Sequence, residues 1–484
     1  MLNMLSFIFF FLLLSIIVLF FLNDAKYLRF YSLLSSSIIF IYSVKLLLLF
    51  DCSNYYFQNI VRYSLNFEFM NLQLSFGLDG ISLFFFILSS FLIFLCVLFV
   101  FDEKHLKYYL LNLFIIEFLL LLVFSVLDIL LFYIFFEAIL IPMYLVIGVW
   151  GSRERKNWAA YMLFFYTLCG SLLLLLGILY IYKITGTFNI EYLLSYNFSD
   201  TEQFFLWLAF FLSFASKIPM FPLHIWLPEA HVEAPTVGSV LLAGILLKLG
   251  VYGFIRFSLP LFPVASLYFT PIIHTLCAIG VVYSSLAAVR QTDLKRIIAY
   301  SSVAHMNLIV IGIFSFNFLG VEGALLQSIS HGFVSAALFF IVGMVYARYH
   351  TRSIYYYSGM VQIMPICSSF FLIFTMANIA LPGTSSFVGE FLILMGIFKI
   401  NFRIALIVVV SVVLCGSYSL WIYNRFSFGN IKHLYILKYS DLTFREFSIL
   451  LPLLIFTLIM GFIPYIYFQF VHSSVIFVLI NSFV

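Results

Sequence analysis

Charged side chains are scarce in this chain of 484 residues, since Asp, Glu, Lys and Arg together make up 9% of it. The net charge is +4 and the basic residues are scattered, which argues against a nucleic-acid surface. Apolar residues make up 64% of the chain, and the mean hydropathy is +1.15. A soluble core cannot hide this much apolar surface. The composition therefore indicates a polytopic membrane protein.

Clustered cysteines are also lacking. The six cysteines lie singly in or beside apolar runs, with no C-x-x-C pair. Zinc and iron–sulfur sites need several cysteine or histidine ligands at close spacing. The chain also has no G-x-G-x-x-G turn after a strand and no Walker phosphate loop. We therefore expect no metal and no cofactor on this chain, and we interpret the cysteines as small apolar side chains.

The apolar runs predict an all-α protein with about fourteen membrane-spanning helices, because one span needs about 20 residues. The expected spans are 4–22, 30–50, 80–101, 109–126, 128–150, 159–182, 203–226, 236–257, 269–289, 294–315, 323–346, 359–399 (broken), 405–426 and 448–469. Most of the 24 Lys and Arg residues lie in loops that follow odd-numbered spans. By the positive-inside rule, both termini should face the opposite side of the membrane.

Two spans are interrupted in a similar way. The seventh contains "FASKIPMFPLHIWLPEAHVEAPTVG" and the twelfth contains "ANIALPGTSSFVGEF". Their separation by five helices predicts two five-helix repeats of opposite orientation with discontinuous helices 7 and 12, which is the plan of secondary transporters. The alternative is that Pro-Gly breaks occur by chance, since both residues are common in spanning helices.

No linker or charge run divides the chain, so we expect one membrane domain made of consecutive parts. The predicted parts are N-terminal helices 1 to 3, a first five-helix repeat, a second inverted repeat, and a connecting loop with helix 14, at 1–108, 109–257, 269–426 and 427–484.

Ionisable side chains at membrane depth cost about 2.5–3.5 kcal/mol each on insertion scales, so those present need a reason. Glu137 precedes Pro142, whose ring frees a backbone carbonyl that can hold water beside the carboxyl group. Lys217 lies at a helix end, where the helix dipole and the low dielectric act against each other on its charge. The alternatives are a structural ion pair for Glu137 and a snorkelling side chain for Lys217.

Further candidates lie deeper in their spans. Lys248 should be near the bilayer middle, and Glu390 follows the break at 382–383. Free histidine titrates near neutrality, so His305 and His331 can relay protons, although a buried histidine is often only a hydrogen-bonded core residue. Glu117 is as plausible a helix-packing partner as a pathway residue. Together these residues suggest a row of proton-exchanging sites.

His224 and His231 lie with two glutamates in "HIWLPEAHVEAPT". Prolines break this segment and no H-E-x-x-H pattern exists, so a metal site is disfavoured. We expect a loop network or a proton uptake gate there.

Four stretches resemble one family. "SKIPMFPLHIWLPEAHVEAPTVGSVLLAGILLKLGVYGFIRF", "DLKRIIAYSSVAHMNLIVIGIF", "SISHGFVSAALFF" and "LPGTSSFVGEFLIL" are similar to the antiporter-like subunits of proton-pumping NADH:quinone oxidoreductase, respiratory complex I, and most to its mitochondrial chain 4 type. The resemblance covers roughly 75–430. It implies fourteen helices, inverted repeats and a central axis of acids and lysines.

By position, the resemblance assigns proton-pathway roles to Glu137, Lys217, Lys248 and Glu390, and less directly to His305 and His331. It also implies that NADH, FMN, iron–sulfur clusters and ubiquinone are handled by partner subunits. The expected partners are the other membrane-arm subunits, including sister antiporter-like chains, and the lipid bilayer, with no nucleic acid.

The resemblance further implies a location in the mitochondrial inner membrane, with both termini on the intermembrane-space side. Two other functions fit the same residues. A stand-alone or Mrp-type cation/proton antiporter would need no complex I partners. A structural spacer in the membrane arm would tolerate neutralisation of Lys217 or Lys248.

Overall fold

The computed structural model describes residues 4–67, 70–100, 104–432 and 440–483. In this part of the chain, thirteen helices are long and apolar enough to cross a membrane. The predicted all-α, polytopic class is therefore confirmed. The interrupted span expected at 203–226 is absent from those thirteen because its helix, Asp200–Lys217, carries three charged side chains in 18 residues. The span expected at 359–399 is absent because it is divided into shorter helices, and a helix at Tyr465–Ser482 is added.

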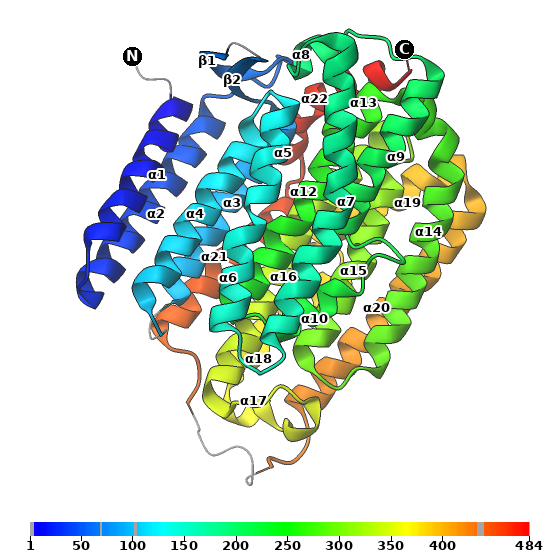
Figure 1. The fold of residues 1–484 in the computed structure, drawn as a ribbon. Helices are drawn as coiled ribbons and strands as arrows, with labels where there is room; N and C mark the ends of the chain where they lie inside the picture. Colours follow the sequence, from blue (N-terminus) through cyan, green and yellow to red (C-terminus); the bar gives the residue numbers. More distant parts are fainter. Residues whose placement is uncertain (1–3, 68–69, 101–103, 433–439, 484) are drawn as a thin grey trace. The chain divides into compact units, whose positions relative to one another are not determined.

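The chain forms two compact units, and the first contains Met1–Lys217, Lys248–Phe269 and Gln469–Val484. Its helices and strands are α1 (Met4–Phe21), α2 (Ala25–Leu48), β1 (Gln58–Phe67), β2 (Met70–Leu78), α3 (Gly80–Phe99), α4 (Leu106–Ser125), α5 (Ile129–Ala138), α6 (Leu140–Trp150), α7 (Lys156–Thr185), α8 (Ile190–Leu193), α9 (Asp200–Lys217), most of α12 (Leu247–Gly253), η2 (Phe254–Ser258), α13 (Leu259–Leu261) and most of α22 (Tyr465–Phe483). In Figure 1, α1 and α2 run side by side in blue, and they are in contact.

The second unit contains Ile218–Leu247 and Thr270–Phe468. Its helices are α10 (Trp226–Glu233), α11 (Thr236–Leu241), η1 (Leu242–Leu246), most of α14 (Pro263–Arg290), α15 (Leu294–Ile313), α16 (Phe318–Tyr349), η3 (Ile354–Tyr356), α17 (Met360–Ile363), α18 (Pro365–Asn378), α19 (Ser385–Ile400), α20 (Phe402–Ser427) and α21 (Phe444–Phe462). Helix α16 packs against α15, α18, α19 and α21.

Both predicted helix breaks are present. Helix α9 ends at Lys217, and the next helix, α10, begins at Trp226. Helix α18 ends at Asn378 and α19 begins at Ser385, with Gly383 between them at a φ of 97°. A positive φ is readily adopted by glycine, so the Pro-Gly pair explains the second break. The inverted relation between the two predicted repeats stays a prediction.

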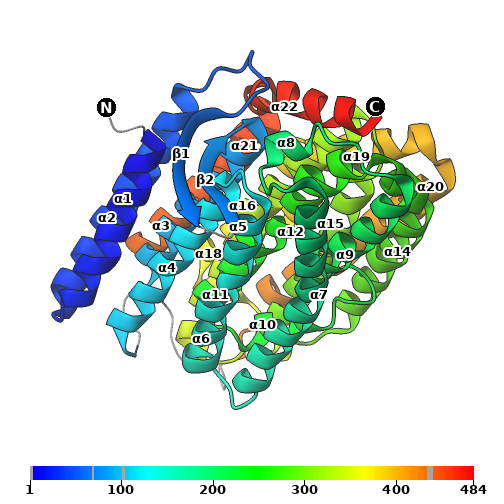
Figure 2. The ribbon, with the colours of Figure 1, turned by 45° about the horizontal axis from the view of Figure 1, so that its top comes forward.

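A β-hairpin lies where the sequence analysis proposed no element. Strands β1 and β2 pair antiparallel, with Gln58 opposite Leu78 and Phe67 opposite Met70, and Figure 2 shows them as two adjacent arrows. Alternating apolar and polar residues at 71–78 would have indicated a strand, since successive strand residues face opposite sides.

The last expected span, 448–469, was wrong because it joins parts of two separate helices. Helix α21 ends at Phe462, and Tyr465 begins α22 directly after Pro464. Proline cannot continue a helix because it lacks a backbone N–H. The predicted final span therefore ends too late, and the helix that follows it was not predicted.

Candidate functional site

The first group of charged residues lies in the first unit and joins α5 to α9. Nζ of Lys217 lies 3.4 Å from Oε1 of Glu137. The same ammonium donates to the backbone carbonyl of Phe136 at 2.6 Å. The side chains are 5% and 13% exposed, so the pair is shielded from solvent. The two residues that the sequence analysis singled out on separate spans are therefore in direct contact.

The end of α9 positions Lys217, and the capped start of α5 fixes the helix that carries Glu137. Lys217 is the last residue of α9, so its ammonium lies at the end of a helix where carbonyls lack helical partners. At the start of α5, Oδ1 of Asp128 accepts hydrogen bonds from the backbone N–H groups of Leu130 and Leu131, both at 3.0 Å. Burial raises the pKa of Asp128 to about 6, partly offset by these two bonds.

Lys248 lies on α12 and is fully buried. Further along the same helix, the hydroxyl of Tyr252 accepts a hydrogen bond from Nε of Arg256 at 3.2 Å. Nη2 of Arg256 lies 2.6 Å from Oδ2 of Asp79, and both side chains are at most 5% exposed. The span Thr236–Leu261, which carries Lys248, therefore also contributes Arg256 to a buried ion pair with Asp79 that was not predicted from the sequence.

Glu117 is fully buried on α4. Neither carboxyl oxygen has a hydrogen-bond partner among the residues that the structure describes. The carboxyl oxygens of Glu137 also lack a hydrogen bond within the described residues, but Nζ of Lys217 lies 3.4 Å from one of them. A buried carboxyl group without a hydrogen bond is costly, and only for Glu137 does a neighbouring cation offset part of this cost.

The second group lies in the second unit, around Glu390 on α19. Oε1 of Glu390 lies 3.0 Å from Nδ1 of His305, a residue of α15. The same oxygen accepts a hydrogen bond from Nε2 of Gln327 at 3.1 Å. Gln327 lies on α16, where a Cβ added at Gly389 would come within 2.7 Å of its Oε1. The glycine therefore permits the close approach that brings the amide to the carboxyl group.

His305 also faces a short polar chain on its other side. Its Nε2 lies 4.0 Å from Sγ of Cys415, and that sulfur lies 3.0 Å from the hydroxyl of Tyr418. The ring of His331 lies 5.7 Å from the ring of His305 between centroids. Tyr418 also lines a small cavity with residues of α15, α16 and α18, among them Ser301 and Asn378.

The segment proposed as a proton uptake gate is held by cations of the same unit. Nζ of Lys295 donates to the carbonyl of Ala234 at 2.9 Å, and Arg296 pairs with Glu229 at 2.7 Å. His224 and His231 are both buried, and the His231 ring stacks on Phe339 at 4.8 Å. The uptake role of these histidines stays a prediction.

The structure thus brings together Glu137 with Lys217, and Glu390 with His305 and His331. It adds Gln327, Cys415, Tyr418 and the Asp79–Arg256 pair to the residues considered. Gln327 and Tyr418 carry no charge, so a search for intramembrane charges could not find them. In the described part of the chain, no three His, Cys, Asp or Glu side chains are grouped to hold a metal ion.

Comparisons with known proteins agree on one family. A model of the family described as "NADH:quinone oxidoreductase/Mrp antiporter, TM" matches residues 125–415. The "NADH-ubiquinone oxidoreductase chain 4" of Marchantia polymorpha is 53% identical, over 91% of this chain and 89% of that protein. The "NADH-quinone oxidoreductase subunit M" of Rhodobacter capsulatus is 46% identical, over 84% of this chain and 82% of that protein.

Among solved structures, a chain of "Respiratory complex I from Thermus thermophilus with bound NADH" is similar in fold. The TM-score is 0.88 at 29% sequence identity, and the match covers 98% of this chain and 99% of that one. The similarity thus extends over nearly the full length of both chains. This chain belongs to the NADH:quinone oxidoreductase/Mrp antiporter family, in its chain 4 branch.

Proposed function

We propose that the buried Glu, Lys and His side chains of this chain carry protons across the membrane. The chain is an antiporter-like, proton-translocating subunit of respiratory complex I, an H+-translocating NADH:quinone oxidoreductase. The observation that carries the assignment of residues is the pairing of titratable groups inside apolar helices, namely Glu137 with Lys217 and Glu390 with His305. The proposed pathway residues are Glu137, Lys217, Lys248, Glu390, His305, His331 and Glu117.

In the first unit, the ammonium of Lys217 is stabilised by Glu137 and by the carbonyl of Phe136. Separating Lys217 from Glu137 would remove the favourable charge interaction and make the lysine release its proton more readily. Redox energy from partner subunits would change this separation, and Lys248 would take up the proton. Coupling of this kind needs only two arrangements of the pair that differ in proton affinity.

In the second unit, Nδ1 of His305 lies 3.0 Å from Oε1 of Glu390, which is within the reach that direct proton transfer needs. Histidine can take a proton on one ring nitrogen and release another from the opposite nitrogen. Nε2 of His305 points to Cys415, beyond which lies Tyr418. We therefore propose that the proton leaves or reaches Glu390 by way of His305, with His331 as a neighbouring acceptor.

The partners and location follow from the same proposal. The other membrane-arm subunits, including sister antiporter-like chains, would flank this chain, and NADH, FMN, iron–sulfur clusters and ubiquinone would be bound by partner subunits. The membrane would be the mitochondrial inner membrane, as the eukaryotic chain 4 relatives suggest. The distribution of Lys and Arg supports termini on the intermembrane-space side.

The proposal is tested by the ratio of protons moved to NADH oxidised. Assembled complex with Glu390→Gln is reconstituted into vesicles, beside wild type and the exposed control Glu154→Gln. We expect a lower ratio for Glu390→Gln and the wild-type ratio for the control. A wild-type ratio in Glu390→Gln would show that protons do not pass through this carboxyl group.

A further inference from the structure

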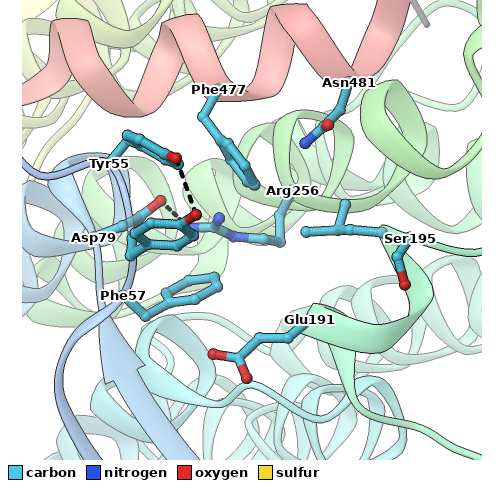
Figure 3. Close-up of a pocket in the computed structure, with 10 residues that line it drawn as sticks. Tyr55, Phe57, Asp79, Glu191, Ser195, Arg256, Phe477 and Asn481 are labelled. Carbon is cyan, nitrogen blue, oxygen red and sulfur yellow. Dashed lines mark hydrogen bonds and ion pairs between the residues drawn. The ribbon is translucent and has the colours of Figure 1, made fainter.

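A second site lies away from the proton-pathway residues, in the first unit. It is a cavity of about 530 Å³, which is within the usual range of small-molecule sites. Its lining comes from segments far apart in the sequence, as Figure 3 shows, and includes Tyr55, Asp79, Glu191, Arg256, Phe477 and Asn481. None of these residues belongs to the proposed proton pathway.

The elements around the cavity place it at a membrane interface. Asp79 directly precedes the span Gly80–Phe99, and Arg256 lies near the end of the span Thr236–Leu261. Glu191 follows the span Lys156–Thr185. The exposed rings of Tyr55 and Tyr56, at 42% and 59%, suit the headgroup region, where tyrosine is enriched. A lipid headgroup is therefore at the right depth to enter the cavity.

One hydrogen-bond donor of the cavity lining is unused. Nδ2 of Asn481 is buried and has no hydrogen-bond partner among the described residues. The guanidinium of Arg256 lines the same cavity, with Nε bonded to Tyr252 and Nη2 next to Asp79. A guanidinium and an amide are both suited to phosphate oxygens. The unused amide and the guanidinium therefore point to an anionic group.

Two carboxyl groups, those of Asp79 and Glu191, also line the cavity and bring negative charge to it. Asp79 neutralises Arg256 from one side. Glu191 lines the cavity, and its Oε2 lies 2.8 Å from Nη2 of Arg62 at the exposed rim. A free phosphate dianion would be repelled by both carboxylates, whereas a zwitterion complements both signs of charge. Figure 3 shows Arg256 between Asn481 on one side and Glu191 on the other.

We propose that this cavity binds the headgroup of a phospholipid with a primary amine. The phosphodiester contacts Arg256 and Asn481, the ammonium lies next to Glu191, and the acyl chains leave along the apolar wall that includes Phe477. The site is independent of the proton pathway, so its failure would leave the proposed function standing.

The test is electron cryo-microscopy of the assembled complex in nanodiscs that contain only phosphatidylethanolamine. We expect elongated density from Arg256 to Glu191 with tails leaving the cavity. The variant Asn481→Leu should lose this density, because losing a hydrogen bond to a charged group weakens binding by about tenfold. The exposed control Asn424→Leu should keep it.

Other outcomes overturn the proposal. Water-sized peaks alone, or the same density in Asn481→Leu as in wild type, would exclude a built headgroup site. Compact density that appears in detergent with inorganic phosphate, and no lipid density in the nanodisc, would identify free phosphate as the occupant. Equal density in nanodiscs of phosphatidylglycerol would show that the amine and Glu191 play no part.

Discussion

Nδ1 of His305 lies 3.0 Å from Oε1 of Glu390, between two helices that are far apart in the sequence. The same carboxyl oxygen accepts a hydrogen bond from Gln327, and the opposite ring nitrogen of His305 faces Cys415. A histidine held between a carboxyl group and a further polar atom can receive a proton on one side and release it on the other. This relationship supports the assignment of Glu390 to proton transfer rather than to helix packing.

The amide of Gln327 should position Glu390 without carrying a proton. Gln327→Leu removes one hydrogen bond to the carboxyl oxygen of Glu390. It should therefore lower the proton-to-NADH ratio, but by less than Glu390→Gln does.

The exposed residue Gln362 provides the control for this prediction, as Gln362→Leu should keep the wild-type ratio. A wild-type ratio in assembled Gln327→Leu complex would remove Gln327 from the account.

Glu137 and Lys217 should act as one unit. We expect Glu137→Gln and Lys217→Met each to lower the proton-to-NADH ratio, and the double variant to lower it no further than the stronger single variant. Residues that work together show such non-additive effects. The exposed Lys183→Met is the control. Losses that add in the double variant would mean that the 3.4 Å contact has no role in coupling.

The stability that the Asp128 cap gives to the start of α5 should depend on pH. Burial raises the pKa of Asp128 to about 6 from 3.8, so the folded state binds this proton more tightly than the unfolded state does. The stability that the protonated form contributes is present at low pH and lost as the pH rises through about 6. Asp128→Asn keeps a capping side chain but cannot ionise.

Amide hydrogen exchange at Leu130 and Leu131 measures this effect, with wild type and Asp128→Asn compared at each pH. We expect equal protection near pH 4 and greater protection in Asp128→Asn at pH 7, with the difference growing by about 1 kcal/mol between pH 5 and 7. A difference that is constant across this range would show that Asp128 titrates normally.

Glycine at position 80 should be required for the packing of α22 on α3. The backbone N–H of Gly80 donates to Oγ of Ser474 at 3.0 Å, and a Cβ at this position would collide with the backbone carbonyl of Phe470. We expect Gly80→Ala to reduce the amount of assembled complex on native gels. Gly416→Ala, where the nearest atom would be 3.8 Å away, should leave assembly unchanged. Normal assembly of Gly80→Ala would contradict this packing.

Much of this architecture could be predicted because lipid imposes simple rules. Spans are long apolar runs, and an ionisable residue such as Lys248 stands out within one. The Pro382–Gly383 pair indicated the broken helix at 378–385 from local backbone chemistry. The β-hairpin was missed because its alternating pattern is short and lies between stronger helical signals.

The neutral members of the candidate site could not be predicted in the same way. Gln327 and Tyr418 are polar residues of a common kind. The packing of α16 on α19 brings Gln327 to Glu390, and Cys415, which contacts both Tyr418 and His305, connects Tyr418 to the charged groups. Asp79 and Arg256 are separated by most of the first unit in sequence. Their pairing depends on tertiary contacts that no local pattern encodes.

The most direct test of the account is the proton-to-NADH ratio of reconstituted complex with Lys248→Met, measured beside the exposed control Lys399→Met. Lys248 is fully buried in the middle of its helix, so its ammonium has no access to the lipid headgroups. If buried charges on this chain carry protons, Lys248→Met lowers the ratio while Lys399→Met does not. An unchanged ratio in assembled Lys248→Met complex would contradict the account and favour a purely structural role for the chain.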